Sequence, residues 1–197
     1  MNSLYSFIVK PLIDRYDNVK NINNKELILN TSIEDHKFVS KKAVVVSTPA
    51  AYKTDVNIGD EVYVHHNIFR RWYDQKGRER NSSTYFKDDL YFVSPEQIYM
   101  YNSNSHLNYC FIKPIKNQSL LYNRKEQPNV GIVKYTNNTL ETLGITPGTL
   151  ITFTPNSEFE FIIDGERLYC MKSNDIALTH EHQRDKIKDN SSWAESS

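Results

Sequence analysis

Apolar and polar residues alternate in two matching stretches, one in each half of the chain. Residues 56–64 read VNIGDEVYV, and residues 145–153 read ITPGTLITF. In each stretch a short turn ends in a glycine, which adopts a positive φ at little cost. An alternating run follows each turn and sends every second side chain to one face, so the pattern predicts a turn and then a strand in both places.

The segments around these stretches repeat as well. A Leu-Tyr pair, a polar step and an isoleucine follow each stretch, at residues 90–98 and again at residues 168–176. Upstream, FIVKPL at residues 7–12 resembles FIKPI at residues 111–115. We therefore predict an all-β fold of two tandem small antiparallel β-barrels.

The predicted organisation has four parts. They are a first barrel at 1–101 with a long hairpin inserted at 67–88, a linker at 102–108, a second barrel at 109–178, and a polar flexible tail at 179–197.

Composition fits this picture and narrows the class of protein. The 197 residues suffice for two domains of about 100 residues, and thirteen Tyr and nine Phe favour β structure. Lys plus Arg equals Asp plus Glu at 24 each, so no overall charge draws the chain to nucleic acid or membrane. No apolar run reaches the roughly 18 residues of a membrane span, and no signal-peptide pattern opens the chain. We expect a cytoplasmic protein, with Cys110 and Cys170 as buried thiols.

A compact apolar run stands inside the polar, asparagine-rich region that begins at residue 14. Its residues are Leu27, Ile28 and Leu29. They could form a strand of the first core or an exposed hook that docks into a partner's groove, and both roles use the same residue types. A weaker apolar patch, Leu120-Leu121-Tyr122, lies in a polar loop of the second half.

The inserted segment 67–88 mixes aromatic and basic side chains. Its densest part is Phe69-Arg70-Arg71-Trp72-Tyr73. Such residues can stack bases and neutralise phosphates, and they also dominate protein interfaces. We expect a hairpin that covers its own barrel or a neighbouring subunit, with nucleic acid the less expected partner.

Sequence motifs of catalysis are missing. The chain has no glycine-rich phosphate loop, HExxH, CxxC or nucleophile elbow. The pairs His65-His66 and His180-x-His182 lack a third ligand at suitable spacing. We expect a protein that is not an enzyme, with no catalytic residues, metal or cofactor.

Several of these motifs resemble the small GroES-type co-chaperonins. Residues 11–15 match the family's Pro-Leu-x-Asp-Arg pattern, residues 27–32 are similar to its mobile-loop tripeptide and the polar residues after it, and residues 56–64 match its glycine turn and strand. The segment 164–177 looks like the family's closing strands.

The resemblance implies a function as well as a fold. A member of this family caps an ATP-driven, GroEL-like chaperonin ring so that a client protein folds in a closed chamber. By this resemblance Leu27, Ile28 and Leu29 are the ring contacts, with residues 120–122 as a loose second hook. Several weak hooks on one oligomer bind together through effective concentration. The Lys-, Asn- and Ile-rich composition suits an AT-rich bacterium or a phage, and for a phage protein the expected location is the host cytoplasm.

Two other functions remain open from sequence. The barrels could serve as building blocks of an oligomeric structural or adaptor protein, for example a phage virion or assembly component. Alternatively, the aromatic and basic hairpin could make the chain a nucleic-acid-binding module.

Overall fold

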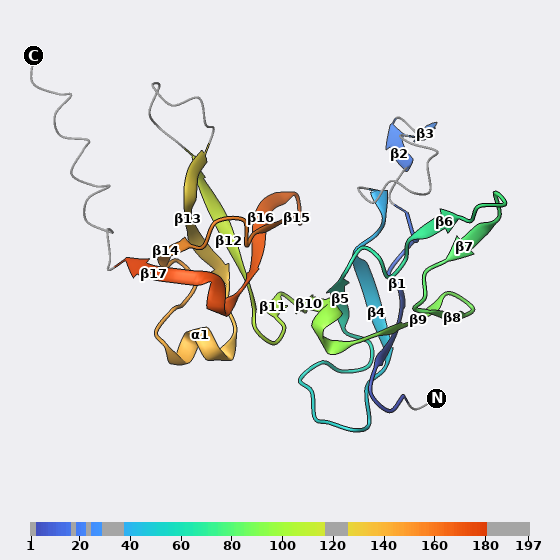
Figure 1. Ribbon diagram of the computed structural model, residues 1–197, viewed down its shortest axis with the longest axis horizontal. Helices are drawn as coiled ribbons and strands as arrows, with labels where there is room; N and C mark the ends of the chain where they lie inside the picture. The colour runs from blue at the N-terminus through green and yellow to red at the C-terminus, as the bar shows by residue number, and fades with distance from the viewer. Residues whose placement is uncertain (1–2, 17–18, 23–24, 29–37, 117–125, 181–197) are drawn as a thin grey trace, which may run out of the picture. The chain divides into compact units, whose positions relative to one another are not determined.

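The computed structural model describes residues 3–16, 19–22, 25–28, 38–116 and 126–180 (Figure 1). These residues form antiparallel sheets in two bodies, and the chain divides into the compact units Met1–Ser103 and Asn104–Ser197. The prediction of an antiparallel β protein with two sheet bodies is confirmed.

The first body is built on a seven-stranded sheet with the order β11-β10-β5-β4-β1-β9-β8. Its strands are β1 (Phe7–Pro11), β4 (Lys42–Ser47), β5 (Glu61–Val64), β8 (Tyr85–Lys87), β9 (Leu90–Val93), β10 (Ile98–Tyr101) and β11 (Asn104–Ser105). A 3-10 turn, η2 (Pro95–Gln97), connects β9 to β10. Two small two-stranded sheets stand outside this ladder: β2 (Val19–Ile22) with β3 (Lys25–Ile28), and β6 (Arg71–Tyr73) with β7 (Glu79–Asn81).

The second body is built on a six-stranded sheet with the order β15-β16-β12-β13-β14-β17. Its strands are β12 (Tyr109–Lys116), β13 (Glu126–Tyr135), β14 (Leu150–Phe153), β15 (Phe159–Ile163), β16 (Glu166–Lys172) and β17 (Ile176–His180). A short helix, α1 (Asn138–Thr142), precedes β14, and the 3-10 turn η3 (Ser173–Asp175) connects β16 to β17. Asn137 caps α1 by accepting a hydrogen bond from the backbone N–H of Leu140 at 3.0 Å.

The two bodies have the same strand order. The order β8-β9-β1-β4-β5-β10 in the first matches β15-β16-β12-β13-β14-β17 in the second. The register matches too, because Val9 lies opposite Tyr91 in the first sheet just as Ile112 lies opposite Tyr169 in the second. The Leu-Tyr segments that repeat in the sequence therefore occupy equivalent places in the two ladders.

The glycine turns are also equivalent. Gly59 has a φ of +92° and Gly148 a φ of +94°, the region that favours glycine. The N–H of Gly59 donates to the carbonyl oxygen of Val45 at 2.8 Å, and that of Gly148 donates to the carbonyl oxygen of Val133 at 2.8 Å. Each turn thus binds the same neighbouring strand of its own sheet.

Each body has its own apolar core. In the first, buried side chains from β1, β4, β5, β9 and β10 pack together with Ile68 and Phe69. In the second, buried side chains from β12, β13, β14 and β16 pack with Leu140 and Ile145. Among the described strands neither ladder closes on itself, since β8 and β11 end the first and β15 and β17 end the second.

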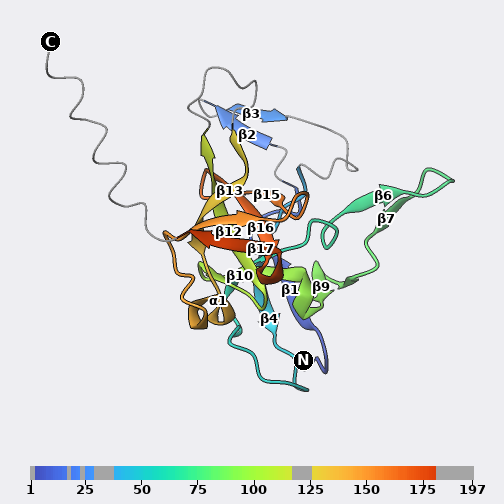
Figure 2. The same cartoon turned by 60° about the vertical axis from the view of Figure 1, so that its left-hand side comes forward.

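The inserted segment is narrower than the sequence predicts. Residues 85–87 of the predicted insertion 67–88 have a counterpart in the second body, because β8 pairs with β9 in the place that β15 takes beside β16. Within the segment 67–88, the hairpin β6–β7 stands apart from both main sheets, and it projects away from the first body in both views (Figures 1 and 2).

Candidate functional site

The predicted hook residues Leu27 and Ile28 lie in β3. Among the described strands it pairs with β2 alone, with Lys20 opposite Leu27 and Val19 opposite Ile28. The hairpin lies in the connection from β1 to β4 and contributes no strand to the seven-stranded sheet. Leu29 and the predicted second hook, Leu120-Leu121-Tyr122, lie outside the described residues.

The connection from β1 to β4, which carries this hairpin, has its two ends side by side on the first body. Tyr16 forms an isolated antiparallel bridge with Val39, and the N–H of Ser40 donates to the carbonyl oxygen of Arg15 at 2.9 Å. Tyr16 and Val39 are both buried in the first core. The two ends of the connection are therefore closed by backbone bonds and by apolar packing.

Arg15, the last residue of the Pro-Leu-x-Asp-Arg pattern, ties this base to the projecting hairpin. Its Nη2 donates to the carbonyl oxygen of Phe69 at 3.2 Å and to Oδ1 of Asn81 at 2.9 Å. Its guanidinium carbon lies 5.4 Å from the centre of the Tyr91 ring. One side chain thus bonds to the segment that leads into β6 and to the last residue of β7.

Tyr16 makes a second link to the hairpin. The N–H of Arg71 donates to the Tyr16 hydroxyl oxygen at 2.8 Å, and the Arg71 guanidinium lies 4.8 Å from the centre of the Tyr16 ring. Arg71 also pairs with Glu79 across the hairpin at 2.9 Å. Burial opposes the charge of Arg71, but its bonds to Glu79 and Tyr16 outweigh burial and raise its pKa.

The five predicted interface residues divide between core and surface. Phe69 is fully buried in the first core, where its ring meets that of Tyr91 edge-on at 4.8 Å, so it is not a surface residue. Arg70 and Arg71 are partly buried. Trp72 and Tyr73 are 45% and 51% exposed.

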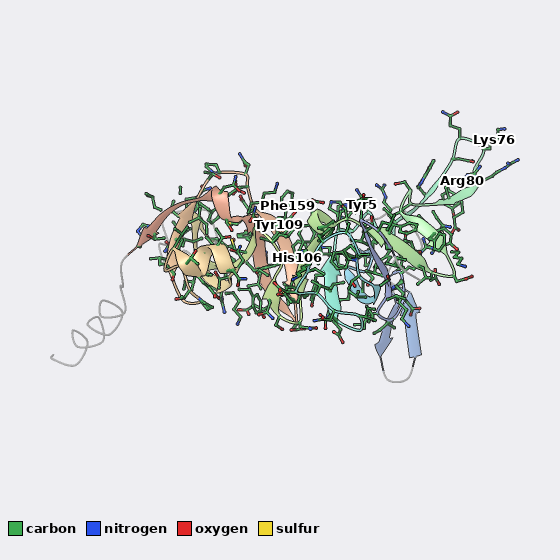
Figure 3. The ribbon with its side chains drawn as sticks, turned by 90° about the horizontal axis from the view of Figure 1, so that it is seen from below. Tyr5, Lys76, Arg80, His106, Tyr109 and Phe159 are labelled. Atoms are coloured by element: carbon green, nitrogen blue, oxygen red, sulfur yellow. The ribbon has the colours of Figure 1, made fainter. Side chains whose placement is uncertain are left out.

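Asp74 organises the free end of the hairpin. Its Oδ1 accepts from the backbone N–H groups of Lys76 and Arg78, each at 2.9 Å, and its Oδ2 accepts from Nε of Arg80 at 3.0 Å. The backbone N–H of Arg78 is the largest cause that lowers the Asp74 pKa, with Lys76 and Arg80 adding to it. The carboxylate therefore stays ionised and fixes the tip; Lys76 lies at its far end, and Arg80 lies further back, in β7 (Figure 3).

The second body carries a charge network across its sheet. Arg167 bonds to Glu126, to Glu160 at 2.8 Å and to the Tyr169 hydroxyl at 2.9 Å, and Tyr169 donates to Glu126 at 2.7 Å. These contacts join β13, β15 and β16, and they suit a structural role.

Both cysteines are free and buried. Cys110 lies opposite Met171 and Cys170 opposite Phe111, so alternation directs the two thiols to opposite faces of the sheet. Burial raises the pKa of both thiols. Within the same residues no group of three or more His, Cys, Asp or Glu could hold a metal ion.

The remaining findings concern membrane-spanning helices and similarity to known proteins. No helix in the described ranges is long and apolar enough to cross a membrane. No protein-family model matches the chain, and no curated protein matches it.

Proposed function

We propose that this chain is a divergent tandem co-chaperonin that docks on a chaperonin ring through the apolar segment 27–29. One observation carries the proposal: β3, which holds Leu27 and Ile28, belongs to a separate hairpin in the β1–β4 connection and not to the main sheet. That position suits a docking segment better than a strand of the main sheet.

The closed base of the connection favours docking of the segment that it carries. Because Arg15, Tyr16, Val39 and Ser40 hold the two ends together, the free connection samples fewer conformations than an untethered segment. Less conformational entropy is then lost when the apolar residues enter a groove. A homo-oligomer with several such segments then binds more tightly than one segment alone, through effective concentration.

In this proposal each body is a GroES-like barrel in a divergent form. The shared strand order and the shared glycine turn support it. So does the polar step before the last strand, where the N–H of Ser94 binds Gln97 Oε1 at 3.0 Å and that of Lys172 binds Asp175 Oδ2 at 3.2 Å. The connection β12–β13 is the counterpart of β1–β4, and it carries the proposed second hook, residues 120–122.

The experiment is capture of a bacterial chaperonin ring in the presence of ADP by the full chain. The test variant is Leu27→Ser with Ile28→Ser. The matched control is Lys25→Ser with Glu26→Ser, which changes two polar residues of the same strand. The proposal expects capture by wild type and by the control, and at least tenfold less by the test variant.

Two results would count against this function. If the folded, oligomeric wild type captures no ring, the bodies serve as an oligomeric structural or adaptor scaffold instead. If the ring binds but both double variants bind it as well as wild type, residues 27 and 28 are not the contact.

A further inference from the structure

The hairpin β6–β7 has one face turned to the body and one turned to solvent. Arg71 lies opposite Asn81, and these two residues contact Tyr16 and Arg15 of the body. Alternation places Trp72 and Arg80, which also lie opposite each other, on the other face. The side chain of Arg80 is 52% exposed, and Trp72 is 45% exposed.

This projecting segment is strongly basic in a chain that is neutral overall. Residues 70–81 contain five basic and two acidic side chains, a net charge of +3, whereas the full chain has a net charge of zero. The basic residues are Arg70, Arg71, Lys76, Arg78 and Arg80. This local excess of positive charge suits the binding of a polyanion. The net charge of the full chain does not reveal it, because acidic residues elsewhere balance it.

We propose that the outward face of the β6–β7 hairpin binds single-stranded nucleic acid, with a base stacked on Trp72 and phosphates held by Lys76, Arg78 and Arg80. An indole ring beside guanidinium groups is the combination that binds single strands without strong sequence preference. An acidic peptide would satisfy the cations but would need an aromatic side chain at one particular position to stack on Trp72, whereas every nucleotide carries a flat base. This difference favours nucleic acid over an acidic protein surface.

The spacing along the hairpin suits an extended strand. Arg78 and Arg80 are two residues apart, and the N–H of Asp74 donates to the carbonyl oxygen of Arg78 at 2.9 Å, which continues the β6–β7 pairing to that point. Two residues of a strand span about 6.6 Å, a step similar to that between successive phosphates of an extended chain. Asp74 holds Arg80 beside Trp72 through the 3.0 Å ion pair, so the stacking and charged groups are arranged before the ligand binds.

Hydrogen bonds to the first body hold the base of the β6–β7 hairpin in place. Arg15 bonds to Phe69, two residues before β6, and to Asn81 at the end of β7, and the Ser82 hydroxyl donates to the carbonyl oxygen of Ile68 at 2.6 Å just beyond the hairpin. None of these contacts uses Trp72, Lys76 or Arg78. We therefore expect substitution of these three side chains to leave the fold unchanged.

The test measures binding of fluorescein-labelled oligo-dT and oligo-U by the full chain across a salt series. Wild type is expected to bind both probes, with log K falling linearly as log salt rises. Lys76→Ala with Arg78→Ala should reduce the magnitude of that slope by about 1.4, because each phosphate contact on a single strand contributes about 0.7. Lys10→Ala with Lys53→Ala removes the same charge from exposed positions outside the hairpin and should leave the slope unchanged.

Base stacking on Trp72 is measured separately from the phosphate contacts. Trp72→Ala should weaken binding about 5- to 150-fold without changing the slope, and Trp72→Phe should retain most of the affinity. The chain has two tryptophans, Trp72 and Trp193, so in a Trp193→Phe background the fluorescence reports Trp72 alone and should be quenched by oligo-dT.

Three results would overturn this inference. They are no binding of either probe at low salt, binding that the hairpin variants do not change, and binding of polyglutamate as tight as that of the oligonucleotides with no quenching of Trp72. The last result would assign the face to an acidic protein partner. None of these measurements involves the chaperonin ring, so failure here is separate from failure of the proposed function.

Discussion

At the scale of single residues, Arg15 joins two segments that lie far apart in the sequence. It belongs to the motif at the start of the docking connection, and it binds Phe69 and Asn81 at the base of the hairpin. No local pattern announces these partners, because they are 54 and 66 residues away. The motif at residues 11–15 draws attention to Arg15 but does not identify its hydrogen-bond partners.

Arg15→Ala should lower the free energy of unfolding by about 1–3 kcal/mol, since it removes two hydrogen bonds from a charged donor. Urea unfolding of the full chain measures this change. Arg78→Ala, at an exposed arginine, is the matched control and should change stability by less than about 0.5 kcal/mol. Equal effects of the two substitutions would show that the Arg15 contacts do not stabilise the fold.

The buried thiol of Cys110 predicts a loss of stability in alkali. Burial is the largest cause and raises its pKa from 9.0 to about 12. Because the folded pKa lies above the unfolded one, the stabilisation is complete below about pH 9 and decreases as the pH rises toward 12. Urea midpoints at pH 8, 10 and 11 should fall more steeply for wild type than for Cys110→Ala, and parallel curves would contradict the assignment.

At the scale of elements, a clear alternation of apolar and polar residues predicted a strand, whereas a segment too short to show alternation did not. The runs around Gly59 and Gly148 predicted their turns and strands, since the side chains that face the core must recur at every second position. The three-residue strand β8 was missed, because it has too few residues for a period and its role comes from pairing with β9. Phe69 was assigned to an interface because composition cannot distinguish a buried aromatic residue from an exposed one.

The equivalent turns predict equivalent costs of substitution. Gly59→Ala and Gly148→Ala should each destabilise the chain by about 1–2 kcal/mol, because alanine resists φ values of +92° and +94°. Around Gly59 a Cβ would meet no atom within 4 Å, so there the cost is purely conformational. Differential scanning calorimetry of both variants checks this, and a neutral effect at either site would contradict the turn geometry.

At the scale of the whole molecule, two bodies with one strand order carry different additions. The first has the hairpin β6–β7, and the second has helix α1 before β14. The repeat could be read from sequence because each copy keeps its own turn and core pattern. The outward face of the hairpin emerged only when pairing and exposure placed Trp72 beside Arg80 and away from the body.

The most direct measurement of the central claim is sedimentation velocity of the fluorescently labelled full chain mixed with a bacterial chaperonin ring. With ADP present, the account predicts that the label moves at the speed of the ring, and that Leu27→Ser with Ile28→Ser returns it to the speed of the free protein. A folded wild type that sediments alone, with and without ADP, would contradict the account.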